Sequence, residues 1–449
     1  MNPIHVGLLG IGTVGGGTFT VLARNAAEIA RRAGRPIVIT AVADKNLERA
    51  REVVGSMPGV RITDDAMSIV DDPSIDIVVE LIGGYGFAKD VVLRAIANGK
   101  HVVTANKALL AVHGTEIFTA AQQQGVTVAF EAAVAGGIPI IKAVREGLTA
   151  NRIEWIAGII NGTTNYILST MRDSGRAFAD VLADAQALGY AEADPTWDIE
   201  GVDAAHKITL LSAIAFGTPV QFDHAHIEGI SKLAAEDIRY AEELGYRIKL
   251  LGITKRVAGG IELRVHPALV PASRLIANVE GVMNAVLVKG DAVGATLYYG
   301  RGAGAEPTGS AVIADLVDVT RLHTADPEHR VPHLAVQADR LENTPIVPMS
   351  EVETACYLRL RVQDKPGVLA DVARILADHG ISIEAMVQKN AAQKNAAPKD
   401  LAEGEGQADI ILLTHITREK HIDAAIARIE GLATTVGQVT RLRLESLAS

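Results

Sequence analysis

Short, almost wholly apolar runs alternate with longer helical patterns over the first 150 residues of the chain. The apolar runs are rich in valine and isoleucine, which is typical of strands buried on both faces, and they lie at Ile4–Leu9, Ile37–Ala43, Ile75–Ile82, His101–Thr104 and Val126–Phe130. The clearest helical patterns between them are Gly15–Ala33 and Phe87–Asn98. This order predicts a doubly wound, parallel α/β sheet as the first domain, over residues 1–150.

The pattern changes beyond residue 150. Longer helical stretches at Phe178–Leu188 and Val202–Ala215 are mixed with alternating runs at Ile261–Val265 and Ala285–Val288. We therefore predict a second, mixed α/β domain over residues 151–330. A polar stretch follows, and it contains Pro332, Pro345 and Pro348. These prolines predict a linker over residues 331–352.

Residues 353–449 predict a third domain. Its elements follow the order strand, helix, strand, strand, helix, strand of the ferredoxin-like unit, at Tyr357–Val362, Val368–His379, Ile383–Val387, Asp409–Ile416, Glu419–Leu432 and Thr440–Glu445. A direct repeat, Gln388–Ala392 followed by Gln393–Ala397, opens a polar stretch that reaches Gln407. We expect residues 388–407 to form a mobile loop.

Composition narrows the range of functions. The 449 residues contain 43 Lys and Arg against 53 Asp and Glu, so the cations that a phosphate backbone requires are not in excess, and we expect no nucleic-acid partner. We also expect no membrane span, because no run of about 18 uncharged apolar residues occurs. The chain enters its first strand without a basic, apolar leader and has one cysteine, Cys356, which together indicate a reducing, cytoplasmic protein.

The first predicted strand leads directly into Gly10-Ile-Gly-Thr-Val-Gly15 and then a helix. In this context Gly10 permits a tight turn, Gly12 lets the backbone approach a pyrophosphate, and Gly15 allows close packing of helix and strand. The motif predicts a Rossmann-type dinucleotide site, the alternative being an ordinary glycine-rich turn. Asp44, after the second strand, suits the ribose hydroxyls of NAD, whereas Lys45 suits the extra phosphate of NADP, so the sequence leaves that choice open.

Five carboxylates, at positions 192, 194, 198, 200 and 203, precede Lys207. In a helix, Asp203 and Lys207 fall on one face, so the aspartate can pair with the ammonium group; a plain exposed ion pair is the alternative. Crowded acids repel one another unless they are solvated or share a cation. The ammonium group of an amino-acid-like substrate would provide such a cation.

A nicotinamide enzyme that reduces a carbonyl needs a proton donor, and Lys207 and Lys107 are the candidates. Lys107 follows the fourth apolar run, at the sheet edge where ligands bind in open α/β folds; an exposed loop lysine is the alternative. Cys356 lies far from the nucleotide loop in sequence, which favours alcohol–aldehyde interconversion over acyl chemistry through a thiol. The thirteen histidines are scattered, and they suggest no transition-metal site.

The stretch Ala185–Lys207, with Gly189-Tyr-Ala-Glu-Ala-Asp-Pro-Thr-Trp-Asp198 at its centre, resembles the signature of homoserine dehydrogenase. The resemblance covers essentially the whole chain and includes Gly10–Gly15, Thr104–Lys107, Glu131–Pro139, Asn161–Asn165 and Gly300–Gly304. It implies NAD(P)H-dependent reduction of L-aspartate 4-semialdehyde to L-homoserine, on the route to threonine and methionine. It also implies that residues 305–330 return to pack on the first domain.

The resemblance implies roles for individual residues. Lys207 would be the proton donor, assisted by Asp203, with Lys107 close to both cofactor and substrate, and Glu192 and Asp198 would hold the amino-acid end of the substrate. The implied cofactor site comprises Gly10, Gly12, Thr13, Val14, Gly15, Ala43, Asp44, Lys45, Gly83, Thr104, Lys107 and Gly302. A monovalent cation, sodium, would be held by backbone oxygens of Glu131, Val134, Gly136 and Ile138, although a plain turn before Pro139 would explain this segment equally well.

The C-terminal unit resembles an ACT regulatory domain through Asp364-Lys-Pro-Gly-Val-Leu369 and Gly380-Ile-Ser-Ile383. ACT domains use the first of these loops to hold amino acids at dimer interfaces, which implies threonine feedback at Asp364, Pro366, Gly367 and Val368 in a homodimer or homotetramer; a unit that only dimerises is the alternative. Two rivals remain for the whole chain: a non-catalytic amino-acid sensor, and a dehydrogenase of another amino-acid aldehyde or hydroxy acid.

Overall fold

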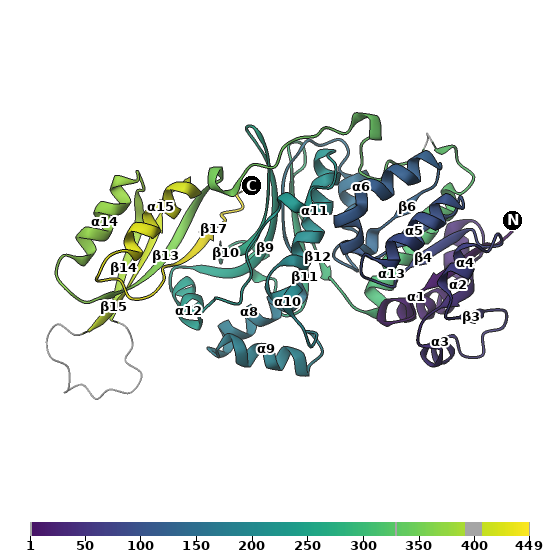
Figure 1. Cartoon of the computed structure of the whole chain (residues 1–449), viewed down its shortest axis with the longest axis horizontal. Coiled ribbons are helices and arrows are strands. Elements are labelled where there is room, and N and C mark those ends of the chain that lie inside the picture. Colours follow the sequence, from purple (N-terminus) through teal and green to yellow (C-terminus); the bar gives the residue numbers. More distant parts are fainter. Residues whose placement is uncertain (1, 328–329, 391–405, 449) are drawn as a thin grey trace.

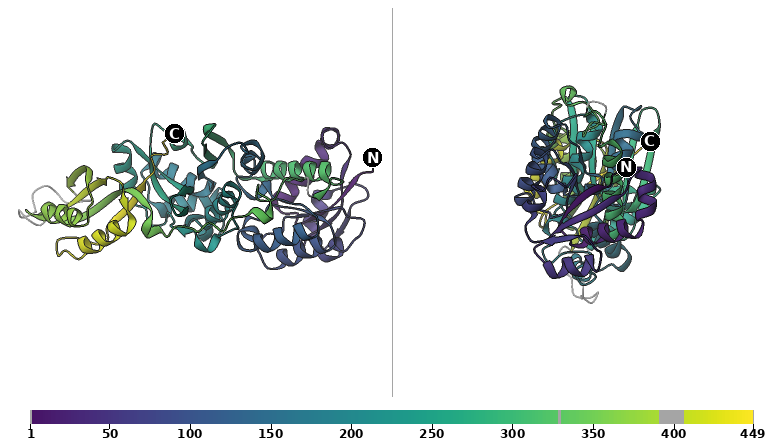
Figure 2. Two further views of the ribbon diagram at one scale, coloured as in Figure 1. Left: turned by 90° about the horizontal axis from the view of Figure 1, so that it is seen from above. Right: turned by 90° about the vertical axis from the view of Figure 1, so that its right-hand side faces the viewer.

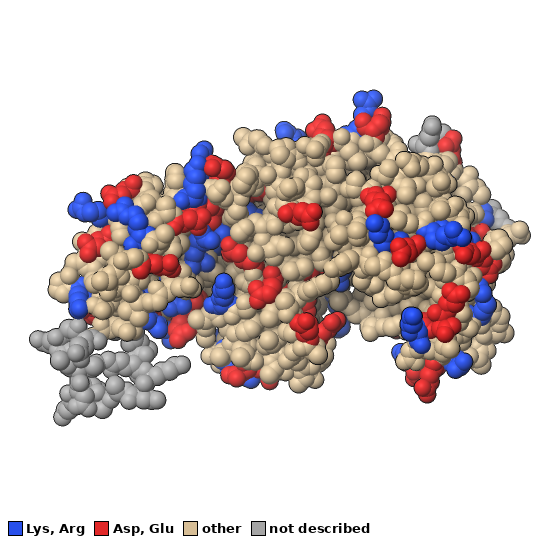
Figure 3. All heavy atoms as spheres, in the orientation of Figure 1, with Lys and Arg blue, Asp and Glu red and all other residues tan. Residues whose placement is uncertain are grey.

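The computed structural model describes residues 2–327, 330–390 and 406–448. The molecule is elongated, with the N-terminal sheet at one end, a central region, and the C-terminal unit at the other end (Figures 1 and 2). The C-terminus itself returns to the central region (Figure 1). On the face shown in Figure 3, acidic and basic side chains are interspersed rather than gathered by sign. In the described part of the chain, no helix has the length and apolarity needed to cross a membrane.

The N-terminal region is built on a six-stranded parallel sheet, which confirms the predicted fold. Its strand order is β3-β2-β1-β4-β5-β6. The strands are β1 (Ile4–Leu9), β2 (Ile37–Ala43), β3 (Arg61–Thr63), β4 (Ile77–Glu80), β5 (His101–Thr104) and β6 (Val128–Ala129). The order reverses between β1 and β4, and ligands of open α/β sheets bind at the carboxyl ends of the strands beside such a reversal.

Helices cover both faces of this sheet: α1 (Thr13–Arg24), α2 (Ala26–Ala33), α3 (Leu47–Val54), α4 (Ala66–Val70), α5 (Phe87–Ala97) and α6 (Lys107–Gln123). The single helix predicted at Gly15–Ala33 is wrong, because Asn25 leaves the helical region and separates α1 from α2. Helix α13 (Ala305–Leu322) packs against α1. The two backbones nearly touch, since a Cβ at Gly17 would lie 2.1 Å from the carbonyl oxygen of Ala305.

The central region contains a sheet with helices on it. Its strands are β7 (Ile153–Ile159), β8 (His226–Ile227), β9 (Tyr246–Val257), β10 (Gly260–Pro271), β11 (Met283–Gly290) and β12 (Gly294–Arg301). These strands pair antiparallel except for the short β8, which pairs in parallel with β10. The helices are α7 (Ile140–Lys142), α8 (Gly162–Ser174), α9 (Phe178–Ala187), α10 (Thr196–Ile199), α11 (Val202–Phe216) and α12 (Ala235–Glu243). Strand β10 is longer than predicted, because it continues through His266 and Pro267 and stays buried as far as Val270.

The C-terminal unit has the predicted strand and helix order: β13 (Glu353–Gln363), α14 (Val368–Asp378), β14 (Ile383–Asn390), β15 (Gln407–Thr414), the short β16 (Thr417–Arg418), α15 (Glu419–Glu430) and β17 (Thr440–Leu444). The ends of the loop predicted over residues 388–407 belong to strands instead, because β14 runs to Asn390 and β15 begins at Gln407; residues 391–405, which hold most of the repeat, lie outside the described residues. The sequence did not predict that β17 pairs in parallel with β10, with Ala268 opposite Arg443. This pairing joins the sheet of the C-terminal unit to the central sheet.

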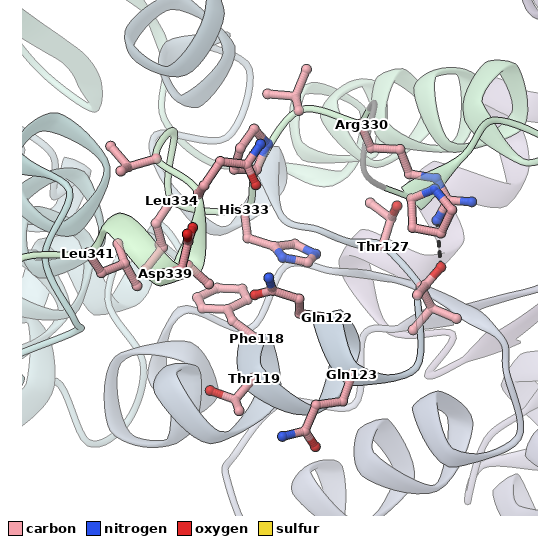
Figure 4. Close-up of a pocket in the computed structure, with 18 of the residues that line it drawn as sticks. Phe118, Thr119, Gln122, Gln123, Thr127, Arg330, His333, Leu334, Asp339 and Leu341 are labelled. Atoms are coloured by element: carbon pink, nitrogen blue, oxygen red, sulfur yellow. Dashed lines mark hydrogen bonds between the residues drawn. The ribbon is translucent and has the colours of Figure 1, made fainter.

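A cavity of about 900 Å³ lies between the end of α6 and the segment that follows α13. In Figure 4, Phe118 and Gln122 of α6 face His333 and Leu334 of that segment. Further along, the chain is held to the central region, where the amide of Ile261 donates to the carbonyl of Pro345. The predicted linker is therefore packed against its neighbours over this stretch.

Two neutral histidines hold strand β6 in place. The Nδ1 atom of His101 accepts the amide N–H of Thr127 at 3.0 Å, and the Nε2 atom of His333 accepts that of Val128 at 3.0 Å. A protonated imidazole has no lone pair with which to accept these bonds. Burial lowers the pKa of each histidine to about 4, so both favour the neutral form in the folded protein.

These histidines predict that acid destabilises the protein. The neutral histidine contributes stability that is fully present above about pH 6.5 and is lost as the pH falls toward 4, by about 3 kcal/mol for the buried His101. Denaturant unfolding of the wild type and of His101→Gln at pH 7 and pH 5 measures this loss, and we expect a smaller pH dependence in the variant. His421→Gln, at an exposed position on α15, is the control, and a pH dependence that is equal in all three proteins would contradict the prediction.

Candidate active site

The glycine loop connects the carboxyl end of β1 to the start of α1. Gly10 has a φ of 91°, and a Cβ there would lie 2.5 Å from the carbonyl oxygen of Leu81. At Gly15 a Cβ would lie 2.0 Å from the oxygen of Gly10. Gly12 differs, because a Cβ there would meet no atom within 4 Å. Gly12 therefore faces open space in front of the first residues of α1, Thr13 and Val14, whose backbone N–H groups can serve an anion.

Asp44 braces the glycine loop. One of its carboxylate oxygens accepts the amide N–H of Ile11 at 2.7 Å, and the other accepts that of Asn46 at 2.7 Å. Ala43, just before it, accepts the amide N–H of Gly10 at 2.8 Å. The adjacent Lys45 is exposed. The structure thus gives Asp44 a role in shaping the loop that the sequence did not predict.

A second brace links the ends of β4 and β5. The buried Glu80 accepts the amide N–H groups of Ile82 at 2.8 Å and Gly83 at 3.1 Å, and it accepts the hydroxyl of Thr104 at 2.7 Å. Asn106 caps α6, which begins at Lys107. Gly83, Thr104 and Lys107 are therefore held at the same sheet edge as the glycine loop. Sequence reasoning missed Glu80, whose position at the end of a strand gives no sign that it is buried.

The predicted catalytic side chains meet in one cluster. The ammonium group of Lys207 donates to Asp203 at 2.5 Å and to the carbonyl oxygen of Ile160 at 2.8 Å. The other carboxylate oxygen of Asp203 lies 3.3 Å from the ammonium nitrogen of Lys107. Asp203 and Lys207 are buried on α11, whereas Lys107 is partly exposed. One carboxylate therefore joins a lysine of the central region to a lysine at the edge of the N-terminal sheet.

Asn161 completes the cluster. Its side-chain N–H group donates to Asp198 at 2.7 Å and to Asp203 at 2.9 Å, and its oxygen accepts the amide N–H of Thr164 at 2.9 Å. Asn161 thus caps α8 while it holds two acids together. The motif Asn161–Asn165 was matched to the family, but sequence reasoning assigned no role to this asparagine.

The charges in the cluster shift one another's protonation. The Asp203 carboxylate is the main cause that raises the pKa of Lys107. Burial opposes the ionisation of Asp203, but Lys207 and Lys107 outweigh it and hold the pKa of Asp203 far below its usual value. Burial, followed by the charge of Asp203, raises the pKa of Asp198. A cation placed beside Asp198 would offset that repulsion.

The five carboxylates of the acidic stretch do not all reach this cluster. Asp198 and Asp203 belong to it, and Glu192 lies on an exposed loop near enough for its charge to raise the pKa of Lys107 slightly. Asp194 instead accepts the hydroxyl of Thr196 at 2.6 Å, and Glu200 lies beside Gly229. The structure therefore brings two of the five acids into the cluster, with Glu192 nearby, and places Asp194 and Glu200 outside it.

The segment predicted to bind a cation is buried and irregular. The carboxylate of Glu131 accepts the amide N–H groups of Ile141 and Lys142, both at 2.9 Å, so it is already engaged. Gly136 has a φ of 45°, and a Cβ there would lie 2.4 Å from the carbonyl oxygen of Gly302. Val134 and Ile138 are also buried. The backbone oxygens of Glu131 and Ile138 also accept amide N–H groups, from Val134 at 3.4 Å and from Ile140 at 2.8 Å, so a cation at this segment stays a prediction.

The predicted regulatory residues lie apart from this site. Asp364, Pro366 and Gly367 occupy the turn between β13 and α14, and Val368 is the first residue of α14, at the opposite end of the molecule from α6 (Figure 1). Gly367 has a φ of 94°, which favours glycine. Any effect of a ligand bound there on the lysine cluster must cross the central region.

The glycine loop carries a prediction about dinucleotide binding. Gly12→Ala should leave the melting temperature unchanged, because its Cβ meets open space, but should weaken dinucleotide binding by about tenfold or more through loss of close backbone approach. Gly17→Ala, whose Cβ would collide with Ala305, should instead destabilise the fold by about 1–3 kcal/mol. Calorimetric titration and thermal melting of both variants test this, and a Gly12→Ala variant with wild-type affinity would contradict it.

Comparisons with known proteins agree over the whole chain. A family model described as homoserine dehydrogenase matches residues 139–317, the model of that family's NAD-binding domain matches residues 10–131, and an ACT-domain model matches residues 357–434. The homoserine dehydrogenases of Pseudomonas aeruginosa and Neisseria gonorrhoeae are 60% and 58% identical to this chain over 447 residues, and each match covers 100% of both chains. The crystal structure of a homoserine dehydrogenase from Thiobacillus denitrificans has a TM-score of 0.93 and 67% identity, covering 100% of this chain and 99% of that one.

Proposed function

Since this chain belongs to the homoserine dehydrogenase family of NAD(P)-dependent oxidoreductases, we propose that it interconverts L-aspartate 4-semialdehyde and L-homoserine on the route to threonine and methionine. The observation that carries the proposal is the cluster in which the buried Asp203 and Lys207 meet the partly exposed Lys107, at the sheet edge that also holds the glycine loop. We further place the enzyme in the cytoplasm, where its single, buried cysteine needs no oxidising environment.

The cluster supports proton transfer to the aldehyde oxygen. A bound nicotinamide dinucleotide supplies the hydride for the aldehyde carbon. Lys207 has three N–H donors, of which Asp203 and the carbonyl of Ile160 occupy two, so the third is available to the substrate oxygen. Lys207 protonates that oxygen during reduction and accepts the proton back during oxidation. Lys107 adds a positive charge that stabilises the developing alkoxide.

The acids around the cluster support recognition of an amino acid. Asp198 is oriented by Asn161, and Glu192 lies at the rim. In this proposal both carboxylates hold the ammonium group of homoserine, and this cation would offset the repulsion between Asp198 and Asp203. The substrate's reactive end then points toward Lys207.

Oxidation of L-homoserine at alkaline pH, measured in parallel with NAD and NADP, tests the proposed reaction. We expect turnover with at least one dinucleotide and a kcat/KM at least about 100-fold lower for 4-hydroxybutanoate, which lacks the ammonium group. Equal rates for the two substrates would contradict the role of the acids. A folded protein that binds the dinucleotide but turns over neither substrate would instead be an amino-acid sensor or a dehydrogenase that acts on another substrate.

Cofactor choice, cation and regulation belong to the same proposal. Because Asp44 already accepts two backbone N–H groups and Lys45 is exposed, the site can accept NADP as well as NAD, and the ratio of the two rates measures the preference. We propose sodium at the backbone oxygens of Glu131, Val134, Gly136 and Ile138, in support of the turn beside Gly302. We propose that threonine bound at residues 364–368 inhibits the enzyme. We also propose that the enzyme is a homodimer or a homotetramer.

A further inference from the structure

The C-terminal ACT domain reaches into the central region through one buried side chain. Arg443 of β17 is 1% exposed, and its guanidinium donates to both carboxylate oxygens of Glu228, at 2.7 and 2.9 Å. The same guanidinium donates to Glu419 of the ACT domain at 2.9 Å. Burial opposes the ionisation of Glu228, but hydrogen bonds from His226 and Arg443 hold its pKa well below the usual value. The pair is therefore charged, bidentate and fixed in place.

The residues after Glu228 pack directly against the turn between α10 and α11. The amide N–H of Ile230 donates to the carbonyl oxygen of Ile199 at 2.8 Å. A Cβ at Gly229 would lie 2.4 Å from that same oxygen, and a Cβ at Gly201 would lie 3.3 Å from the carbonyl oxygen of Glu228. The two segments touch without spare room, so a shift of residues 228–230 must move the α10–α11 turn.

That turn directly follows Asp198, one of the two acids proposed to bind the substrate's ammonium group. Ile199 directly follows Asp198, and the carbonyl oxygen of Asp198 accepts the amide N–H of Gly201 at 3.0 Å. Gly201 is the N-cap of α11, which bears Asp203 and Lys207. The position of Asp198 relative to Asp203 therefore depends on the α10–α11 turn, where residues 228–230 pack against it.

From this contact chain we infer that Arg443 and Glu228 are positioning residues for the amino-acid end of the substrate, and that the ACT domain acts on the active site through them. The inference rests on the proposed function, which places the ammonium group of the substrate at Asp198. Neither residue touches the substrate. They hold residues 228–230 in place, and these residues in turn hold Asp198. Loss of the pair should therefore change the affinity for the substrate more than the rate of the chemical step.

A second bridge between the ACT domain and the central region provides a matched control. Arg359 of β13 donates to Asp237 at 2.9 Å, and Asp237 belongs to α12, which packs on α8 and β9. Loss of this bridge loosens the same domain contact while it leaves the turn at residues 199–201 in place.

Steady-state kinetics of the full-length wild type, Glu228→Gln, Gly229→Ala and Arg359→Gln test the inference. We expect Glu228→Gln to raise the KM for L-homoserine about tenfold, with kcat and the KM for the dinucleotide changed by less than about threefold. Gly229→Ala, which pushes on the turn while the ion pair stays intact, should give the same split if Glu228→Gln fails to fold. Arg359→Gln should keep the wild-type KM, and the kcat/KM for 4-hydroxybutanoate should stay the same in all four proteins.

Two results would overturn the inference. One is an unchanged KM for homoserine in both the Glu228 and Gly229 variants, and the other is an equal rise in the Arg359 variant, which would indicate general loosening of the ACT domain. Failure of the proposed function is a separate outcome, because the wild type would then not oxidise homoserine at all.

Discussion

Lys207→Met is expected to lower kcat for homoserine oxidation by about 10²–10⁴-fold, the usual contribution of a general acid or base. Methionine keeps the apolar stem of the side chain but removes the ammonium group that bonds to Asp203 and to the carbonyl of Ile160. Dinucleotide binding should persist, because the glycine loop does not contact this residue. Stopped-flow measurement of nicotinamide reduction, together with calorimetric titration of the dinucleotide, separates the two effects.

Lys255→Met is the matched control, because Lys255 is an exposed lysine on β9 of the same region. It should keep the wild-type kcat. If Lys207→Met retained kcat within about threefold of the wild type, the proton would have to come from another group, and Lys107 would be tested next.

Asp203→Asn is expected to lower kcat/KM by about 10²-fold or more while the protein stays folded. The substitution keeps the shape of the side chain but removes the charge shared by Lys207, Lys107 and Asn161. Since Asp203 is the main cause that raises the pKa of Lys107, that pKa should fall in the variant. The alkaline limb of the pH profile for aldehyde reduction should therefore move to lower pH.

The pH profiles of kcat/KM for the wild type and Asp203→Asn measure this shift. Asp184→Asn provides the control, because Asp184 pairs with Arg176 on the surface and such pairs contribute little. A shift to higher pH, or an unchanged profile in a variant whose kcat/KM is lowered, would show that Asp203 does not govern the lysine charges.

The parts of the site that follow local rules were predictable from the sequence. The spacing of Asp203 and Lys207 along a helix predicted their pairing, and the position of Lys107 after a parallel strand predicted its place at the sheet edge. The glycine loop followed from its motif and its strand and helix context. The homoserine dehydrogenase resemblance and the three-part fold were confirmed by the family matches and by the solved structure.

The parts that depend on distant contacts were not predictable. Asn161 reaches Asp203 across 42 positions in the sequence, and Glu80 is recognisable as a brace only when its contact with Thr104 at the end of β5 is known. The parallel pairing of β17 with β10 is also invisible in the hydrophobic pattern, because that pattern gives a strand's buried faces and not its neighbour. The break at Asn25 was not predictable either, because the helical pattern continues across the residue that separates α1 from α2.

A crystal structure of the protein with a dinucleotide and L-homoserine tests the assignment of the active site most directly. The hydroxyl oxygen of homoserine should lie within about 3 Å of the ammonium nitrogen of Lys207, and its ammonium group should contact Asp198 and Glu192. Homoserine bound away from these residues, for example in the cavity between α6 and residues 330–341, would contradict that assignment.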